Sequence, residues 1–180
     1  MHVVFIGLAG VGKSTWGREL ARLLACPFSD LDVLVERAMQ QSILDLFAAG
    51  RAEKFRNMEA QILCEMLLDD SPGVTATGGG APMSTGNDDL WHRAHVIWLN
   101  PPLNAVIQRL EKEWQQRPLL SKWGEDHWQN ELAQQFDSRK SRYMQLADEV
   151  WEEASSDDLH ARCAAFCAHR ASKLRKAQDK

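Results

Sequence analysis

A short apolar run that leads directly into a glycine-rich turn constrains the fold of this chain more than any other feature. Residues 3–6 are all apolar, as expected for a strand that is buried on both faces. The next nine residues, Gly7-Leu8-Ala9-Gly10-Val11-Gly12-Lys13-Ser14-Thr15, match the pattern G-x-x-x-x-G-K-[ST]. Apolar residues at three- and four-residue spacing then predict a helix from Lys13, which Pro27 ends. This order of strand, loop and helix predicts a nucleotide-binding α/β fold.

The residue types in this loop suit a nucleoside triphosphate. Glycines let the backbone approach phosphate oxygens and present N–H groups at a helix N-terminus. Lys13 would bring a positive charge to the β- and γ-phosphates, and the Ser14 hydroxyl would be a ligand of Mg²⁺. The pattern arises by chance in fewer than ~1% of chains of this length. The predicted ATP contacts are Gly10, Val11, Gly12, Lys13, Ser14 and Thr15.

The rest of the chain alternates between strand and helix patterns. Further strands are predicted at residues 74–77 and 95–99, and a short apolar stretch follows at 150–151. With 180 residues, the chain is long enough for one domain, and the alternation predicts a mostly parallel sheet with helices around it. The predicted helices are 32–41, a short helix capped by Ser42, 53–68, 87–94, 103–115, 129–146 and 157–174.

Composition excludes several classes of protein. The chain is 44% hydrophobic and 26% charged, as in folded soluble proteins, and no apolar run approaches the ~18 residues of a membrane span. A net charge of −4 argues against a nucleic-acid partner, although residues 170–180 form a basic tail. Four scattered cysteines and an N-terminus without a basic segment indicate a cytoplasmic protein. We expect a monomer that binds neither nucleic acid nor membrane.

Cysteine spacing near the C-terminus allows two interpretations. Cys163 and Cys167 lie four residues apart with His160 nearby, so a helix could place all three on one face as metal ligands. No C-x-x-C or H-x-x-x-H pattern accompanies them. A half-buried helix face that uses cysteine as a small hydrophobic residue is therefore the favoured interpretation. Core packing likewise explains Trp16, Trp98 and Trp114 better than a cofactor site does.

Charged residues beyond the loop favour a kinase of small molecules. Asp30 and Asp32 lie two residues apart, so in an extended segment their carboxylates would share a face. There they could hold Mg²⁺ or its water shell and accept a proton from an attacking hydroxyl; a solvated turn is the alternative. Glu59 follows Arg56 by three residues, either as a simple ion pair or to orient Arg56 toward an anionic substrate. The chain has no N-K-x-D element, which GTPases need to read their base.

Three later segments fit the same interpretation. Gly78-Gly79-Gly80 follows a predicted strand and permits close approach of the backbone to a ligand. Arg117-Pro118-Leu119-Leu120 interrupts a helix, so Arg117 could move over the phosphates during transfer. Arg139 lies on a predicted helix beside Arg142, and a solvated basic face is the alternative there.

Together these segments resemble the motifs of the shikimate kinase family, because they occur in the same order and at nearly the same spacing. The resemblance covers most of residues 1–150, and the combination is far more specific than any single motif. The matching segments are Gly7 to Thr15, Asp30-Leu31-Asp32, Phe55-Arg56-Asn57-Met58-Glu59, Gly78 to Gly80, Arg117 to Leu120, and Arg139 to Tyr143.

The resemblance implies an ATP:shikimate 3-phosphotransferase. Its expected fold is a three-layer P-loop kinase fold with a central five-stranded parallel sheet, a substrate-binding subdomain at about 32–60 and a mobile lid at about 112–128. On the ATP side, Lys13 and Arg117 would hold the phosphates and act in catalysis. Ser14 would be a direct ligand of Mg²⁺, and Asp30 would reach the ion through water.

On the acceptor side, the resemblance assigns Asp32 to the ring hydroxyls and makes it the candidate base. Arg56 and Arg139 would bind the carboxylate of shikimate, since an anionic polyol needs arginines for its carboxylate and a carboxylate for its hydroxyls. The backbone of Gly78, Gly79 and Gly80 would contact the ring.

The chain departs from the family pattern at two places. Arg51-Ala52 stands where the family usually has Gly-Glu, and Ser141-Arg142 stands where Pro-Leu commonly precedes the tyrosine. Neither departure removes a residue that the resemblance assigns to chemistry. Two alternatives therefore accompany shikimate phosphorylation: a kinase of another small hydroxy acid such as gluconate, and a non-catalytic protein that only binds nucleotide.

Overall fold

Five parallel strands form the centre of the protein. The computed structural model describes residues 2–116, 120, 123–152 and 156–178. The strands lie in the order β2-β3-β1-β4-β5, and every neighbouring pair is parallel, with Val4 of β1 opposite Thr75 of β3 and Val96 of β4. Their bounds are β1 His2–Ile6, β2 Phe28–Asp30, β3 Gly73–Ala76, β4 Ala94–Leu99 and β5 Glu149–Trp151.

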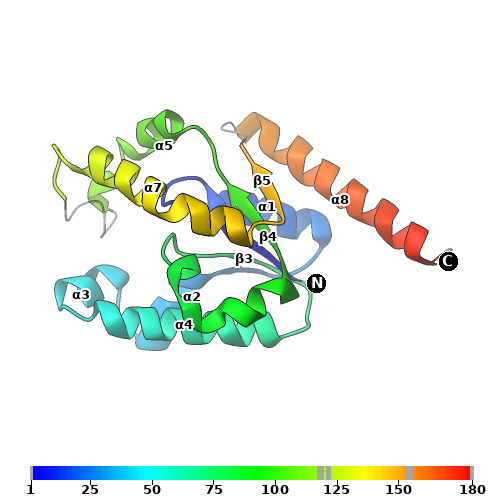
Figure 1. The fold of residues 1–180 in the computed structure, drawn as a ribbon, viewed down its shortest axis with the longest axis horizontal. Helices are drawn as coiled ribbons and strands as arrows, with labels where there is room; N and C mark the ends of the chain where they lie inside the picture. Colours follow the sequence, from blue (N-terminus) through cyan, green and yellow to red (C-terminus); the bar gives the residue numbers. More distant parts are fainter. Residues whose placement is uncertain (1, 117–119, 121–122, 153–155, 179–180) are drawn as a thin grey trace.

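Helices cover both faces of this sheet (Figure 1). Helices α1 and α8 pack against each other, and α2 packs against α4. The three-layer arrangement and the five-stranded parallel sheet that the family resemblance implies are therefore confirmed. The α-helices are α1 Lys13–Leu24, α2 Leu31–Met39, α3 Ile43–Ala48, α4 Ala52–Leu68, α5 Leu103–Leu110, α7 Trp128–Leu146 and α8 Ser156–Gln178, and the 3₁₀ helices are η1 Ala81–Met83, η2 Thr85–Arg93 and η3 Trp114–Gln116.

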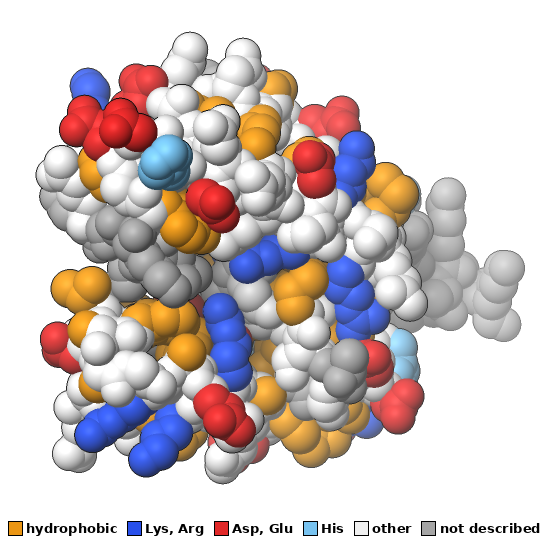
Figure 2. Space-filling model, turned by 60° about the vertical axis from the view of Figure 1, so that its left-hand side comes forward, with side chains coloured by type: hydrophobic (Ala, Val, Ile, Leu, Met, Phe, Trp, Pro, Cys, Tyr) orange, Lys and Arg blue, Asp and Glu red, His pale blue; other side chains and the backbone are white. Residues whose placement is uncertain are grey.

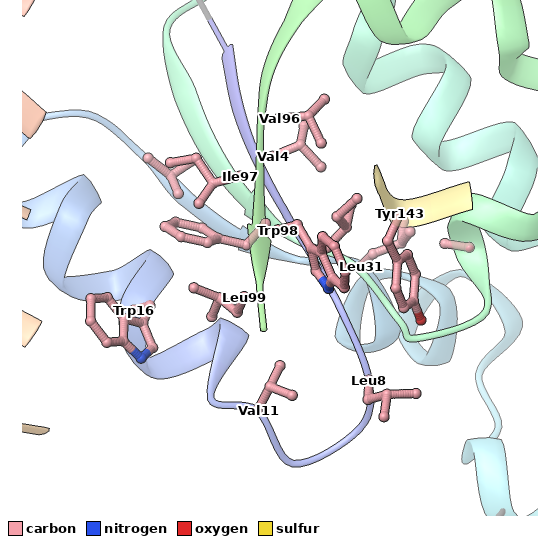
Figure 3. Close-up of a cluster of buried hydrophobic side chains, with 14 of the residues drawn as sticks. Val4, Leu8, Val11, Trp16, Leu31, Val96, Ile97, Trp98, Leu99 and Tyr143 are labelled. Atoms are coloured by element: carbon pink, nitrogen blue, oxygen red, sulfur yellow. The ribbon is translucent and has the colours of Figure 1, made fainter. Parts of the chain in front are cut away.

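Alternating side chains of the strands pack against the helices on the two faces of the sheet. Phe5 contacts Trp151 edge to face, and Trp151 in turn meets Trp16 of α1 and Phe166 of α8. On the other face, Trp98 packs against Tyr143 of α7 with 5.8 Å between ring centroids, within the cluster shown in Figure 3. Residues 3–6 are fully buried, as the unbroken apolar run predicts.

Core packing is confirmed for the three tryptophans. Trp16 and Trp98 are buried in the core, and Trp114 is partly buried and packs against it. None of the described helices combines the length and the apolar character that crossing a membrane requires.

Three expectations about the elements need correction, and one strand was missed. The helix predicted over 103–115 ends at Leu110, because residues 111–113 are charged and exposed and no apolar face continues there. The segment predicted as a helix at 87–94 is the 3₁₀ helix η2. Strand β2 was not predicted, since its three residues Phe-Ser-Asp contain a single apolar side chain. Helix α8 extends to Gln178, four residues beyond the predicted end.

Candidate active site

The loop between β1 and α1 wraps around its own lysine. Gly10 has φ 81°, and a Cβ there would come within 2.7 Å of the Leu110 side chain, so only glycine fits. The Lys13 ammonium group is buried and donates to the carbonyls of Gly7 at 2.8 Å and Leu8 at 2.7 Å. The sequence therefore builds a compact turn at the N-terminus of α1, the place where backbone N–H groups are available to bind an anion.

A cavity of about 280 Å³ opens beside this loop. Ser14 and Asp30 face each other in its wall, and the Ser14 hydroxyl donates to Asp30 Oδ2 at 2.5 Å. Two lining residues, Arg109 and Glu113, were missed by the sequence analysis. The Arg109 guanidinium donates to the carbonyl of Gly10 at 3.0 Å, a contact across 99 positions that no local pattern signals.

The two aspartates lie together, but not on one extended segment as predicted. Asp30 ends β2 and caps the N-terminus of α2, with its Oδ1 accepting the Asp32 N–H at 3.2 Å. Asp32 therefore lies in the first turn of α2, because a capping aspartate starts a helix one residue later. Burial raises the pKa of Asp32 above its ordinary value, against the opposing charges of Lys13 and Arg56.

A second cavity of about 320 Å³ contains every side chain that the resemblance assigns to the acceptor. Asp32, Arg56 and Arg139 line it together with the three glycines at 78–80. The cavity also has an apolar wall that the sequence analysis did not assign, and it consists of Ile43, Leu44, Phe47, Phe55 and Leu120. Gln135, one helical turn before Arg139, also lines the cavity and was missed although its i−4 spacing signals it.

Arg56 is held by a buried carboxylate. Its Nη1 lies 2.5 Å from Glu59 Oε2, and the Glu59 side chain is 2% exposed. The other oxygen of Glu59 is buried and has no hydrogen-bond partner among the residues that the structure describes. Burial raises the pKa of Glu59, although the neighbouring Arg56 opposes that change. The ion pair predicted from the i,i+3 spacing is present and faces the cavity.

The three glycines let the backbone lie directly against these charged groups. A Cβ on Gly78 would lie 2.6 Å from Asp32 Oδ1 and 2.7 Å from Glu59 Oε1. A Cβ on Gly80 would lie 2.7 Å from both terminal nitrogens of Arg56. Side chains at these positions would displace the charged groups, so the glycines serve close approach. Arg139 Nη1 also lies against this backbone and donates to the carbonyl of Gly79 at 3.1 Å.

The two cavities adjoin. Both are lined by Ala9, Asp32, Gly78 and Gly79. Figure 2 shows the end of the molecule that carries α3 and α7. Several Lys and Arg side chains lie beside the hollow between the upper and lower parts of this view. Arg117 lies outside the described residues. Leu120, from the same R-P-L-L segment, is buried in the wall of the larger cavity.

Two groups of residues outside the cavities have structural contacts. Cys163 is buried in the core, where burial raises the pKa of its thiol to about 12, and the exposed His160 lies 2.7 Å from Glu19. Arg142, for which a solvated face was the alternative, instead forms an ion pair with Asp88 and donates to the carbonyl of Pro82. It is partly buried, and η1 packs against α7.

Comparison with known proteins agrees with this geometry. The family model "Shikimate kinase" matches residues 9–169. The chain belongs to the shikimate kinase family. A shikimate kinase of Brucella canis is 40% identical over 119 residues, which are 66% of this chain and 58% of that protein. The chain thus spans less than two thirds of the length of this relative.

Solved structures agree with the family assignment. Shikimate kinase from Acinetobacter baumannii, in complex with shikimate, has 27% sequence identity and a TM-score of 0.84, covering 96% of this chain and 93% of that chain. A gluconokinase from Sinorhizobium meliloti 1021 has 15% identity and a TM-score of 0.55, covering 98% of this chain and 96% of that one. The latter likeness concerns the fold alone.

Proposed function

We propose that this protein transfers the γ-phosphoryl group of ATP to the 3-hydroxyl of shikimate. The observation that carries the proposal is the meeting of two cavities at Asp32: one is lined by the phosphate-binding loop, the other by Arg56 and Arg139. A phosphoryl donor in the first and a hydroxyl acceptor in the second would react at their shared wall. In-line transfer needs this kind of positioning more than covalent chemistry.

The acceptor cavity matches a small carboxylate-bearing polyol. Arg56 and Arg139 supply charge-assisted donors for a carboxylate, and Asp32 supplies an acceptor for hydroxyls. The apolar wall formed by Ile43, Leu44, Phe47, Phe55 and Leu120 suits the carbon face of a ring. The Acinetobacter baumannii relative is solved in complex with shikimate, which supports this acceptor here.

Each assigned side chain has a defined task. Asp32 accepts the proton of the attacking hydroxyl, and its raised pKa strengthens it as a base. Lys13 neutralises charge on the transferring phosphoryl group, and Arg117 closes over the phosphates. Gly10, Val11, Gly12 and Thr15 bind phosphate through the loop around Lys13.

A magnesium ion would fit beside Ser14 and Asp30. Their contact at 2.5 Å places a hydroxyl and a carboxylate together, which is an oxygen donor set that Mg²⁺ uses with phosphates and water. When bound, the ion neutralises phosphate charge. Ser14 would be a direct ligand and Asp30 would hold the ion through water. We also propose that the protein acts as a cytoplasmic monomer without nucleic-acid or membrane partners, as its composition suggests.

A coupled assay of ADP release, with ATP, Mg²⁺ and shikimate, tests the proposal. We expect ADP release with shikimate and a phosphorylated product that carries the phosphate on the 3-hydroxyl by ³¹P NMR. Gluconate and other hydroxy acids serve as comparison acceptors. Faster turnover of gluconate would show a kinase of another hydroxy acid, and no ADP release with any acceptor would show a non-catalytic nucleotide-binding protein.

A further inference from the structure

Tyr143 has no task in the phosphoryl transfer described above, yet it reaches the acceptor cavity's backbone. It is the one tyrosine of the chain and follows Arg139 by four residues, so both lie on the same face of α7. Its ring is fully buried against Trp98. Its hydroxyl donates to the carbonyl of Gly79 at 2.6 Å. Figure 3 shows Tyr143 beside Trp98 in the core cluster.

The Gly79 carbonyl therefore accepts from two donors of one helix. Arg139 Nη1 lies 3.1 Å from the oxygen that the Tyr143 hydroxyl also contacts. A carbonyl oxygen has two lone pairs, so these donors can satisfy it completely. Burial raises the pKa of Tyr143, which keeps the phenol protonated and able to donate throughout the physiological range.

Holding this carbonyl also sets the direction of the next N–H group. The peptide between Gly79 and Gly80 is planar and trans, so its carbonyl and the Gly80 N–H point in opposite directions. Glycines on both sides offer little steric resistance to rotation of that peptide. Both residues line the acceptor cavity, and Gly80 lies against the Arg56 guanidinium. A rotation here would disturb the surface on which an acceptor rests.

We propose that Tyr143 is a positioning residue for the acceptor. Its hydroxyl fixes the Gly79–Gly80 peptide, so that the other guanidinium N–H groups of Arg139 stay directed at the acceptor's carboxylate. Without the hydroxyl, Arg139 alone holds the carbonyl, and the peptide gains rotational freedom. This inference rests on the proposed shikimate kinase function.

Tyr143→Phe tests the inference because it removes only the hydroxyl and keeps the buried ring. We expect the KM for shikimate to rise about three- to tenfold, the effect of losing one hydrogen bond. The KM for ATP should stay within about twofold, and kcat should change less than the shikimate KM. Met144→Leu, a substitution at an exposed neighbour on the same helix, is the matched control and should leave all three values unchanged.

Other outcomes separate this inference from the proposed function. A wild-type protein that releases no ADP with shikimate contradicts the proposed function. An active wild type whose shikimate KM is unaffected by Tyr143→Phe, even with a lowered Tm, contradicts the positioning role and leaves a structural one. Equal increases of both KM values would also contradict it.

A second measurement needs no variant. Tyrosine labelled with ¹³C at Cζ gives a single NMR signal in this chain. We expect shikimate to shift that signal, because its carboxylate would bind Arg139, which shares the Gly79 carbonyl with the Tyr143 hydroxyl. ADP alone should leave the signal in place. A signal that shikimate does not move, at a concentration that saturates turnover, would overturn the inference.

Discussion

At the scale of single residues, the acceptor cavity brings several charged groups close together. Asp32, Glu59 and Arg56 all lie against the backbone of Gly78 and Gly80. Burial disfavours the ionised carboxylates, while the arginine favours them. Each of these groups therefore depends on its neighbours, and a single substitution should change both binding and the pairing of the remaining charges.

Lys13→Ala should lower turnover by about three orders of magnitude or more. Lys13 is proposed to neutralise charge on the transferring phosphoryl group, and such electrostatic terms dominate phosphoryl transfer. Steady-state ADP release measures the effect, and circular dichroism should show an unchanged fold. Lys140→Ala removes an exposed lysine outside both cavities and should retain full activity. Near-full activity of a folded Lys13→Ala protein would contradict the kinase assignment.

Arg56→Ala and Arg139→Ala should each reduce acceptor use about tenfold to a hundredfold. Each arginine is proposed to donate charge-assisted contacts of roughly 1.5–3 kcal/mol to the carboxylate. The KM for ATP should barely change, because the loop around Lys13 lines the other cavity. Arg56→Ala should also lower Tm, since it leaves the buried carboxylate of Glu59 without its ion pair.

The methyl ester of shikimate provides the decisive comparison for these two variants. The wild-type protein should discriminate strongly against the ester, and both variants should discriminate much less. If each variant still prefers the free acid by the wild-type factor, then neither arginine reads the carboxylate.

At the scale of elements, the sequence pattern predicts those strands and helices whose formation depends on neighbouring residues in the chain. The buried run of β1, the loop and α1 follow from adjacent residues, as does the capping of α3 by Ser42, whose hydroxyl accepts the Asp45 N–H. Strand β2 could not be predicted, because its pairing with β3 and not its own composition makes it a strand.

The same limit applies to the candidate site. Asp32 and Arg139 converge from distant elements and line one cavity. The residue types around Asp32 suggested a proton acceptor, but only the family resemblance assigned both residues to one acceptor. Arg109 of α5 and the three wall residues of α3 carry no local signal, because only the packing of these helices brings them to the cavities. The position of Asp32 in a helix depends on the cap that Asp30 provides.

The predicted lid at about 112–128 can be tested through its tryptophans. Trp128 is buried and stacks on Trp114 with 6.1 Å between ring centroids, whereas Trp123 is half-buried. If this segment closes over nucleotide, Trp123 should change its surroundings most. Adding ADP should therefore change the fluorescence, and Trp123→Phe should remove most of that change. A change that survives in the Trp123→Phe, Trp128→Phe double variant would place the movement elsewhere.

At the scale of the whole molecule, the site is built at the cost of stability. Loops at the carboxyl ends of β1, β2 and β3 bring the two cavities together, with Asp32 in the wall between them. In parallel sheets this edge is where ligands bind. The Asp32 carboxylate loses its hydrating water at this edge, and in the ligand-free protein no ligand replaces those hydrogen bonds. Its negative charge therefore destabilises the ligand-free protein.

Asp32→Asn should therefore stabilise the ligand-free protein while it lowers turnover. Because burial raises the folded-state pKa of Asp32, the ionised carboxylate destabilises the fold at pH 7, and this penalty disappears as pH falls below the ordinary carboxyl pKa. We expect Tm at pH 7 to rise by roughly 2–4 °C, which corresponds to about 1 kcal/mol for a chain of this size. The difference from wild type should shrink toward pH 4. Asp89→Asn, at an exposed position outside both cavities, should show no such pH-dependent gain. A Tm for Asp32→Asn that equals or falls below the wild-type value at pH 7, or a gain that is constant with pH, would show that the charge of Asp32 does not destabilise the fold.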